Sequence, residues 1–300
     1  MYNAFYGLDR APFRVNPDPS FLYFSESHEE ALATLLYAVK ERKGFVVLTG
    51  EVGTGKTTVL NALLERMADR DFGLNVRTAY LFNTILSRED FFGYLFEELG
   101  LELPTPFQKG RALHALNEFL IERLRDGGQT LLLIDEAQNL SRELLEEIRM
   151  LSNLETPASK LLQIVLVAQP ELDQTLALPE LRQLRQRVEL RHSIRPLDAT
   201  ETTEYVRRRL LTAGHESGDL FSRGALRALY RLSRGIPRVI NVVCDSAMLA
   251  GFVAQLQRIP SSVIEQAAAD LRLKDAPATA PHGDGVRGRW SRRLWFRAAG

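Results

Sequence analysis

Three runs of almost only apolar residues, at 45–49, 130–134 and 161–168, end in polar or glycine-rich segments. Strands that are buried on both faces of a parallel sheet read as such continuous runs, whereas half-exposed strands alternate. A capping-box spacing of Ser27 and Glu30 marks the start of a helix. The remaining pattern predicts helices at 27–43, 58–64, 87–99, 111–125 and 141–154, and a further strand at 74–81. This alternation predicts a three-layer α/β/α domain with a parallel sheet.

Beyond residue 195 the pattern changes, because only helical segments follow. They are expected at 200–212, 222–233, 237–254 and 262–271, separated by loops that contain glycine and proline. A bundle of about 75 residues buries little surface by itself, so we expect it to dock against the α/β domain.

The segment between the first apolar run and its helix carries the most specific chemistry. It has the spacing G-x-x-x-x-G-K-T, with Gly50, Glu51, Val52, Gly53, Thr54, Gly55, Lys56 and Thr57 followed by Thr58. The glycines let successive N–H groups point at one centre, and the following helix adds the positive end of its dipole. Lys56 is expected to reach the β- and γ-phosphates, and the Thr57 hydroxyl to ligate Mg²⁺. The sequence therefore predicts a nucleoside triphosphate site.

Two carboxylates end the second apolar run. Asp135 and Glu136 directly follow this predicted strand, at the carboxyl edge where ligands bind in open α/β sheets. Asp135 is expected to hold Mg²⁺ beside Thr57, directly or through water. Glu136 is placed to orient or deprotonate the attacking water. Gln169 holds the same position after the third run, and we expect it to hydrogen-bond the γ-phosphate or the water.

Basic residues in two places complete the candidate site. Arg182, Arg185 and Arg187 lie close together in the sequence, and one of them is expected to stabilise transition-state charge in a neighbouring subunit. The alternative interpretation of this charge run is a solvated face. Arg238 follows Pro237 at the start of a predicted helix, at a position that can face the phosphates.

The two ends of the chain differ from these domains. Residues 1–24 contain three prolines, which disfavour a regular helix, and many aromatic rings, so an extended arm is expected. Its rings either wall an adenine pocket or only pin the arm to the core. The linker-like and then basic stretch 273–300 is predicted to be a disordered tail, the alternative being contact with anionic lipid or nucleic acid. The expected division is 1–24, 25–195, 196–272 and 273–300.

Composition adds the broad class. The 300 residues are 45% hydrophobic and 25% charged, with 38 basic residues against 38 acidic ones. Zero formal charge provides no global attraction to nucleic acid or anionic lipid. The single cysteine, Cys244, lies in an apolar helical stretch, which indicates a buried thiol in a reducing cytoplasm. The N-terminus lacks the features of a signal peptide, and no apolar run approaches the ~20 residues of a membrane span.

In this order the motifs resemble those of the general secretion pathway protein A (ExeA-type) AAA+ ATPases. That family includes ATPases of pilus assembly and of exopolysaccharide or exosortase systems. The resemblance covers about residues 1–270. Beside the glycine-rich loop, it rests on Phe5-Tyr6-Gly7-Leu8, Pro17-Asp18-Pro19, Ile134-Asp135-Glu136-Ala137-Gln138-Asn139-Leu140, Gln169-Pro170-Glu171-Leu172 and Gly235-Ile236-Pro237-Arg238.

The resemblance implies an AAA+ core with a helical lid, ATP hydrolysis with Mg²⁺, a homo-oligomer, and envelope or secretion assembly proteins as partners. By motif match, the resemblance assigns Lys56 and Thr57 to the P-loop, and Asp135 and Glu136 to Mg²⁺ and water. It assigns Gln169 and Arg238 to the two sensor positions, and Arg187 to the arginine that acts in trans. The expected location is cytoplasmic, with the tail as a peripheral contact at the inner membrane. Such secretion proteins continue into a transmembrane helix and a peptidoglycan-binding domain, neither of which is expected in this sequence, so the resemblance does not extend to peptidoglycan binding.

Other function classes share parts of this pattern. A DNA-associated AAA+ ATPase that regulates transposition or replication has the same core and would use residues 207–209, Arg231, Arg234 and the C-terminal arginines. Zero net charge argues against it. A P-loop kinase is a second alternative, but Asp135 and Glu136 favour water as the phosphate acceptor. A non-hydrolysing binder fits least, because every catalytic position is filled.

Overall fold

Five parallel strands form a single sheet in the computed structural model, which describes residues 2–14, 18–69, 72–82, 84–157 and 159–273. The strands are β1 (Phe45–Gly50), β2 (Val76–Leu81), β3 (Gln129–Ile134), β4 (Gln163–Ala168) and β5 (Leu190–Ile194). Their order is β2-β3-β4-β1-β5, and neighbouring strands pair in parallel. The three central strands are buried along their whole length, and they are the three apolar runs of the sequence. Their carboxyl ends therefore meet at one edge of the sheet.

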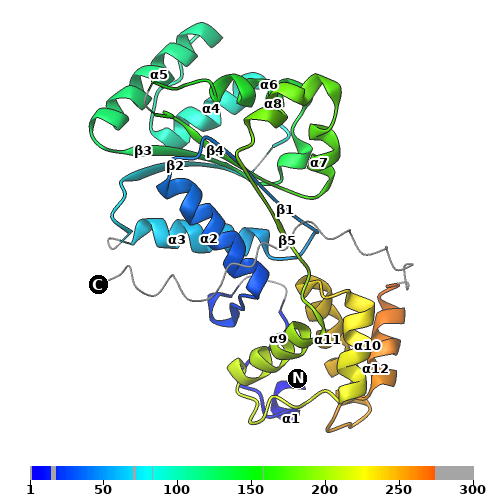
Figure 1. Cartoon of the computed structure of the whole chain (residues 1–300). Helices are drawn as coiled ribbons and strands as arrows, with labels where there is room; N and C mark the ends of the chain where they lie inside the picture. Colours follow the sequence, from blue (N-terminus) through cyan, green and yellow to red (C-terminus); the bar gives the residue numbers. More distant parts are fainter. Residues whose placement is uncertain (1, 15–17, 70–71, 83, 158, 274–300) are drawn as a thin grey trace, which may run out of the picture.

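Helices cover the two faces of the sheet in separate layers (Figure 1). One layer contains α2 (Glu26–Lys40) and α3 (Lys56–Ala68). The other contains α4 (Arg88–Leu99), α5 (Lys109–Arg125), α6 (Arg142–Leu151), α7 (Glu171–Leu176) and α8 (Arg182–Arg187), with the 3₁₀ turns η3 (Ala137–Asn139) and η4 (Pro179–Leu181). Along β3, Leu132 packs into the second layer and Leu133 into the first, as alternate residues of a strand must. The predicted three-layer α/β/α sheet is confirmed.

Four further helices form a bundle at one end of the molecule (Figure 1). They are α9 (Ala199–Thr212), α10 (Arg223–Ser233), α11 (Pro237–Val253) and α12 (Ser261–Asp270), and we call this bundle the lid. Its apolar interior contains Cys244, whose side chain is fully buried. Burial raises the pKa of this thiol well above its ordinary value. The sequence prediction of a buried thiol is therefore confirmed.

The N-terminal arm packs mainly on the lid. The expectation of a wholly extended arm is wrong at its start, because α1 (Tyr2–Phe5) forms a helical turn ahead of the prolines, and η1 (Pro19–Phe21) follows later. Tyr6 and Phe13 are buried in the lid interior, so these two rings anchor the arm there. Edge-to-face ring pairs join Phe5 to Phe252, Phe13 to Phe221 and Tyr23 to Tyr205, with centroids 5.4, 6.1 and 5.6 Å apart.

Other differences from the sequence prediction have physical reasons. β5 is an edge strand in which Leu190 and Ile194 face inward while Arg191 and Ser193 are exposed, so it forms no apolar run. α7 and α8 have six residues each, too few for helical periodicity to show. α2 begins at Glu26, because the capping box is made by residues 25 and 28 and not by 27 and 30.

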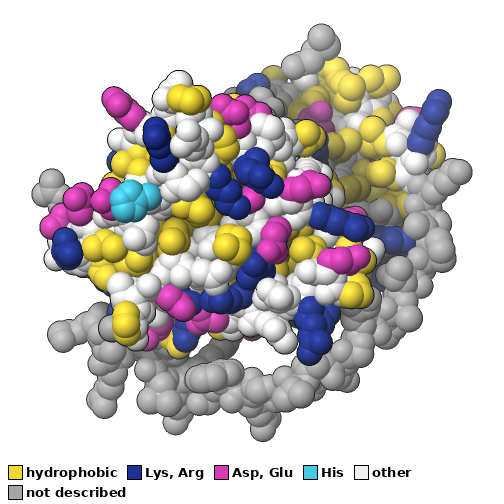
Figure 2. Space-filling model, turned by 90° about the horizontal axis from the view of Figure 1, so that it is seen from above, with side chains coloured by type: hydrophobic (Ala, Val, Ile, Leu, Met, Phe, Trp, Pro, Cys, Tyr) yellow, Lys and Arg dark blue, Asp and Glu magenta, His cyan; other side chains and the backbone are white. Residues whose placement is uncertain are grey.

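The surface seen in Figure 2 carries lysine and arginine side chains interspersed with aspartate and glutamate. Adjacent charges of opposite sign weaken the long-range field of that face. None of the helices in the described part of the chain combines the length and the apolar content that a bilayer crossing requires. The predicted tail, from residue 274 onward, lies outside the described residues, as do residues 15–17 of the arm.

Candidate nucleotide site

Residues 50–57 form the P-loop, which connects β1 to α3. Two of its glycines have backbone angles in the left-handed region, with φ of 80° at Gly53 and 98° at Gly55. A β-carbon on Gly53 would lie 2.6 Å from Cβ of Arg238, and one on Gly55 would lie 2.7 Å from Nε2 of His28. The P-loop is therefore packed between the first turn of α11 in the lid and the first turn of α2.

Lys56 is buried at the start of α3, and its ammonium group lies inside the P-loop. Nζ donates to the carbonyl oxygens of Gly50, at 2.8 Å, and Glu51, at 3.1 Å. Burial lowers the pKa of Lys56, while the carboxylates of Glu136 and Asp135 act in the opposite direction. The structure thus places the expected phosphate-binding lysine beside both expected carboxylates.

Asp135 connects the end of β3 to the P-loop helix. The Thr57 hydroxyl donates to its Oδ2 over 3.2 Å, and the Tyr80 hydroxyl, from β2, donates to the same oxygen over 3.3 Å. Its other oxygen accepts the backbone N–H of Glu136 at 2.9 Å. Burial, reinforced by the Asp135 charge, raises the pKa of Tyr80 to about 12, so this phenol is a hydrogen-bond donor at neutral pH. These contacts fix the orientation of a buried carboxylate.

Glu136 stands in a left-handed backbone conformation, with φ of 52°, and its carboxylate turns towards two amide side chains. Oε2 accepts N–H from Gln138 at 2.6 Å and from Gln169 at 3.1 Å. Burial opposes ionisation of Glu136, but the two amide hydrogen bonds and the charge of Lys56 outweigh it and lower the pKa of this carboxyl. Glu136 is therefore a carboxylate at neutral pH, able to accept a proton. Gln169 contacts it directly, as the sequence position suggests.

Arg238 brings the lid to the P-loop. It follows Pro237 in the first turn of α11, and its backbone N–H approaches the carbonyl oxygen of Gly53 at 3.4 Å. The structure thus gathers the residues expected from two domains, including one from the lid, around one loop.

Replacing Gly53 with alanine is expected to lower both stability and nucleotide affinity. Alanine at φ of 80° costs about 1–2 kcal/mol, and its β-carbon would collide with Cβ of Arg238 at 2.6 Å. Gly73→Ala is the matched control, because Gly73 has φ of 70° and a β-carbon there meets nothing within 4 Å. Thermal unfolding and nucleotide titration of both variants separate the backbone cost from the collision. Equal melting temperatures for the two variants would show that the lid does not press on the P-loop.

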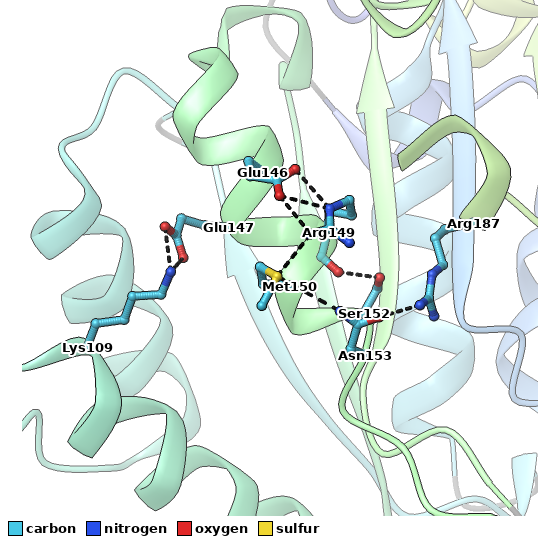
Figure 3. Close-up of polar contacts among 8 residues, drawn as sticks. All are labelled: Lys109, Glu146, Glu147, Arg149, Met150, Ser152, Asn153 and Arg187. Carbon is cyan, nitrogen blue, oxygen red and sulfur yellow. Dashed lines mark hydrogen bonds and ion pairs between the residues drawn. The ribbon is translucent and has the colours of Figure 1, made fainter. Parts of the chain in front are cut away.

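The arginines of α8 belong to a different set of contacts. Arg182 and Arg185 are exposed, and Arg187 donates to Oδ1 of Asn153 in the turn after α6 (Figure 3). α8 packs in the helical layer opposite α3. The structure therefore does not place these three arginines among the hydrogen bonds that Lys56, Asp135 and Glu136 make.

Three residues of the site were missed by the sequence reasoning. Gln138 lies inside the motif that follows β3, but its spacing gives no sign that its amide returns to Glu136. Tyr80 reaches Asp135 only because β2 pairs with β3. His28 bonds the Thr54 carbonyl at 2.6 Å, and its only sequence signal is its position three residues after the N-cap serine of α2.

Most residues of this site lie within a stretch of the chain that matches known proteins. Residues 39–176, which include the P-loop and the residues after β3 and β4, match the AAA domain family. The chain is also 42% identical, over 275 residues and 90% of its length, to general secretion pathway protein A of Aeromonas hydrophila. The chain therefore contains an AAA domain at residues 39–176. The chain spans about half, 48%, of the length of the secretion relative.

Solved structures show the same fold around this AAA domain. The ORC2 protein of Aeropyrum pernix, in ADPNP and ADP complexes, matches with a TM-score of 0.60 and 18% identity over 88% of this chain and 72% of its own. Drosophila ORC bound to DNA matches with a TM-score of 0.67 and 20% identity over 88% of this chain and 65% of its own. At such identities the likeness concerns the fold alone. The predicted resemblance, the AAA+ fold and the nucleotide-binding class of this chain are confirmed.

Proposed function

We propose that this AAA-domain protein hydrolyses ATP with Mg²⁺ and uses the cycle to assemble or remodel a bacterial envelope complex. The observation that carries the proposal is the convergence of Lys56, Thr57, Asp135 and Glu136 on one loop at the carboxyl edge of the sheet. Similarity to a protein named for general secretion, across most of this chain, supports the envelope setting.

The residues present fit Mg²⁺ that is bound together with ATP. Thr57 Oγ1 and Asp135 Oδ2 lie 3.2 Å apart and offer two oxygen ligands. Mg²⁺ is commonly held by one or two carboxylates plus substrate phosphates. Within the described residues no cluster of three or more histidine, cysteine, aspartate or glutamate residues makes a separate metal cage. When bound, Mg²⁺ neutralises charge that develops on the phosphates.

The remaining roles follow from position and charge. Lys56 binds the phosphates, and the N–H groups of residues 50–58 surround them. Glu136 takes a proton from the attacking water, while Gln169 orients that carboxylate or the γ-phosphate. Arg238 binds the phosphates from the lid, so that bound nucleotide changes the position of the lid. Its backbone N–H already contacts the P-loop. General acid–base catalysis of this kind contributes about 10²–10⁴-fold.

Phosphate release by the purified chain tests the ATPase part of the proposal. We expect release from ATP that requires Mg²⁺, stops when EDTA is added, and returns when Mg²⁺ is restored. Phosphate transfer to an added acceptor without matching free phosphate would instead make the chain a kinase. Binding of ATP without any turnover would leave only a nucleotide-binding role and contradict the proposal.

We further propose a homo-oligomer in which Arg187 completes the site of a neighbouring copy. The Arg187→Ala and Glu136→Gln variants are each expected to lack turnover, because each removes a different half of that shared site. In an equimolar mixture that assembles at random, roughly a quarter of the shared sites combine an intact Glu136 with an intact Arg187 from the neighbour. The mixture should therefore recover roughly a quarter of wild-type activity. Arg185→Ala is the matched control and should stay active alone. A mixture without recovery would contradict the shared site.

The proposed location is the cytoplasm, with peripheral contact at the inner membrane.

Two of the arginines that the DNA-associated alternative would use already make contacts within the chain. Arg209 is buried and donates to the Pro12 carbonyl at 2.6 Å, and Arg231 lies 3.2 Å from Glu265. ATPase stimulation by duplex DNA that declines steeply with salt would favour that alternative. We expect no such stimulation.

A further inference from the structure

His28 lies in the first turn of α2 and contacts the P-loop from outside. Its side chain is 3% exposed, and Nε2 lies 2.6 Å from the carbonyl oxygen of Thr54. On the other side of the ring, Nδ1 lies 3.2 Å from the backbone N of Ser25 and 2.6 Å from its Oγ. A carbonyl oxygen only accepts and a backbone N–H only donates, so Nε2 carries the proton and Nδ1 accepts. The contacts therefore define one neutral tautomer of the imidazole.

The carbonyl that His28 binds controls the direction of a neighbouring N–H group. In a trans peptide, the C=O and N–H groups point in opposite directions. Because the Thr54 carbonyl points at His28, the N–H of Gly55 in the same peptide points away from His28, to the other side of the P-loop. Gly55 has φ of 98°, and a β-carbon there would lie 2.7 Å from Nε2 of His28, so only glycine fits beneath the ring.

The turn that carries His28 is itself held by the connection to the lid. The Ser27 hydroxyl accepts the backbone N–H of Arg195, after β5, at 2.9 Å. The backbone N–H of Glu26 donates to Glu201 of α9 at 3.3 Å. With the cap hydrogen bonds of Ser25, these contacts fix the first turn of α2 on three sides. A ring on a fixed turn holds the peptide that it contacts better than a mobile surface side chain does.

We propose that His28 is a positioning residue, which holds the peptide between Thr54 and Gly55 in the orientation that binds nucleotide phosphates. The proposal rests on the proposed ATP site and adds a residue that touches no phosphate itself. His28 acts through one donated hydrogen bond, and the interaction is made equally in the ground state and in the transition state. Its loss should therefore raise the KM for ATP and leave kcat nearly unchanged.

Two near-isosteric substitutions separate this role from helix capping. Asparagine keeps an acceptor near the position of Nδ1, so His28→Asn retains the cap but has no donor that reaches Thr54. Glutamine places an N–H donor near the position of Nε2, so His28→Gln restores the contact with the P-loop without an aromatic ring. Calorimetric titration with ADP should give about tenfold weaker binding for His28→Asn and binding within threefold of wild type for His28→Gln.

The ADP titrations distinguish a failure of the proposed ATP site from a failure of the His28 role alone. Lys56→Ala is the reference: if wild type binds ADP no better than this variant, the proposed ATP site fails and not only His28. If wild type binds and Lys56→Ala does not, wild-type affinity in His28→Asn, or equal weakening in both His28 variants, overturns the positioning role. Thermal unfolding shows whether each variant is folded. Should His28→Asn not fold, His28→Gln decides: wild-type affinity supports a role for the donor, and a tenfold loss overturns it.

Discussion

Replacing Lys56 with alanine is expected to remove nucleotide binding and, with it, all ATP turnover. The buried ammonium group of Lys56 points into the P-loop, where it donates to the carbonyl oxygens of Gly50 and Glu51. Truncating one partner of a buried, hydrogen-bonded charge pair typically costs on the order of 3 kcal/mol, or roughly a hundredfold in Kd. Calorimetric titration with ADP and with a non-hydrolysable ATP analogue measures this loss directly.

Lys40→Ala is the control for a general effect of removing a positive charge. Lys40 is exposed in the last turn of α2, so this variant should bind nucleotide as wild type does. Thermal unfolding shows whether Lys56→Ala is folded. Unchanged affinity in the folded Lys56→Ala protein would mean that nucleotide binds elsewhere.

Glu136→Gln should bind ATP within a few-fold of wild type and lose nearly all turnover. The amide retains an oxygen that can accept from Gln138 and Gln169, so the local hydrogen bonds survive. It cannot take a proton from water, and losing a general base lowers turnover by about 10²–10⁴-fold. Single-turnover phosphate release at saturating ATP separates this loss of chemistry from any loss of binding.

Glu146, a surface carboxylate on α6, provides the control for Glu136. Glu146 is half exposed on α6, where it pairs with Arg149, so Glu146→Gln should hydrolyse ATP at the wild-type rate. Near-normal turnover in Glu136→Gln would exclude Glu136 as the base. The neighbouring Asp135 would then need to be examined in the same assay.

The predictable part of the fold is the part with continuous or long periodic patterns. β1, β3 and β4 appear in the sequence as apolar runs because both of their faces are buried. β5 has only one inward face and includes Arg191, so its pairing with β1 is visible only in three dimensions. The arm shows the same limit: its rings are obvious in the sequence, but nothing local says that Phe13 meets Phe221 of the lid.

The site divides in the same way. Lys56 and Thr57 follow from a fixed spacing, and Asp135 and Glu136 from their place after a buried strand. Contacts that cross between distant segments leave no local pattern. The bond from His28 to the Thr54 carbonyl depends on how α2 lies against the P-loop, which no spacing encodes.

Capture of the ATP-bound state in cells tests the central claim most directly. Glu136→Gln should hold ATP and its partner together, so crosslinking and purification of this variant from its native cells should recover the partner. Lys56→Ala, processed in parallel, identifies proteins that associate without nucleotide. The account predicts envelope or secretion components that are enriched with Glu136→Gln and absent with Lys56→Ala. Chromosomal DNA together with a recombinase or a replication protein would contradict it.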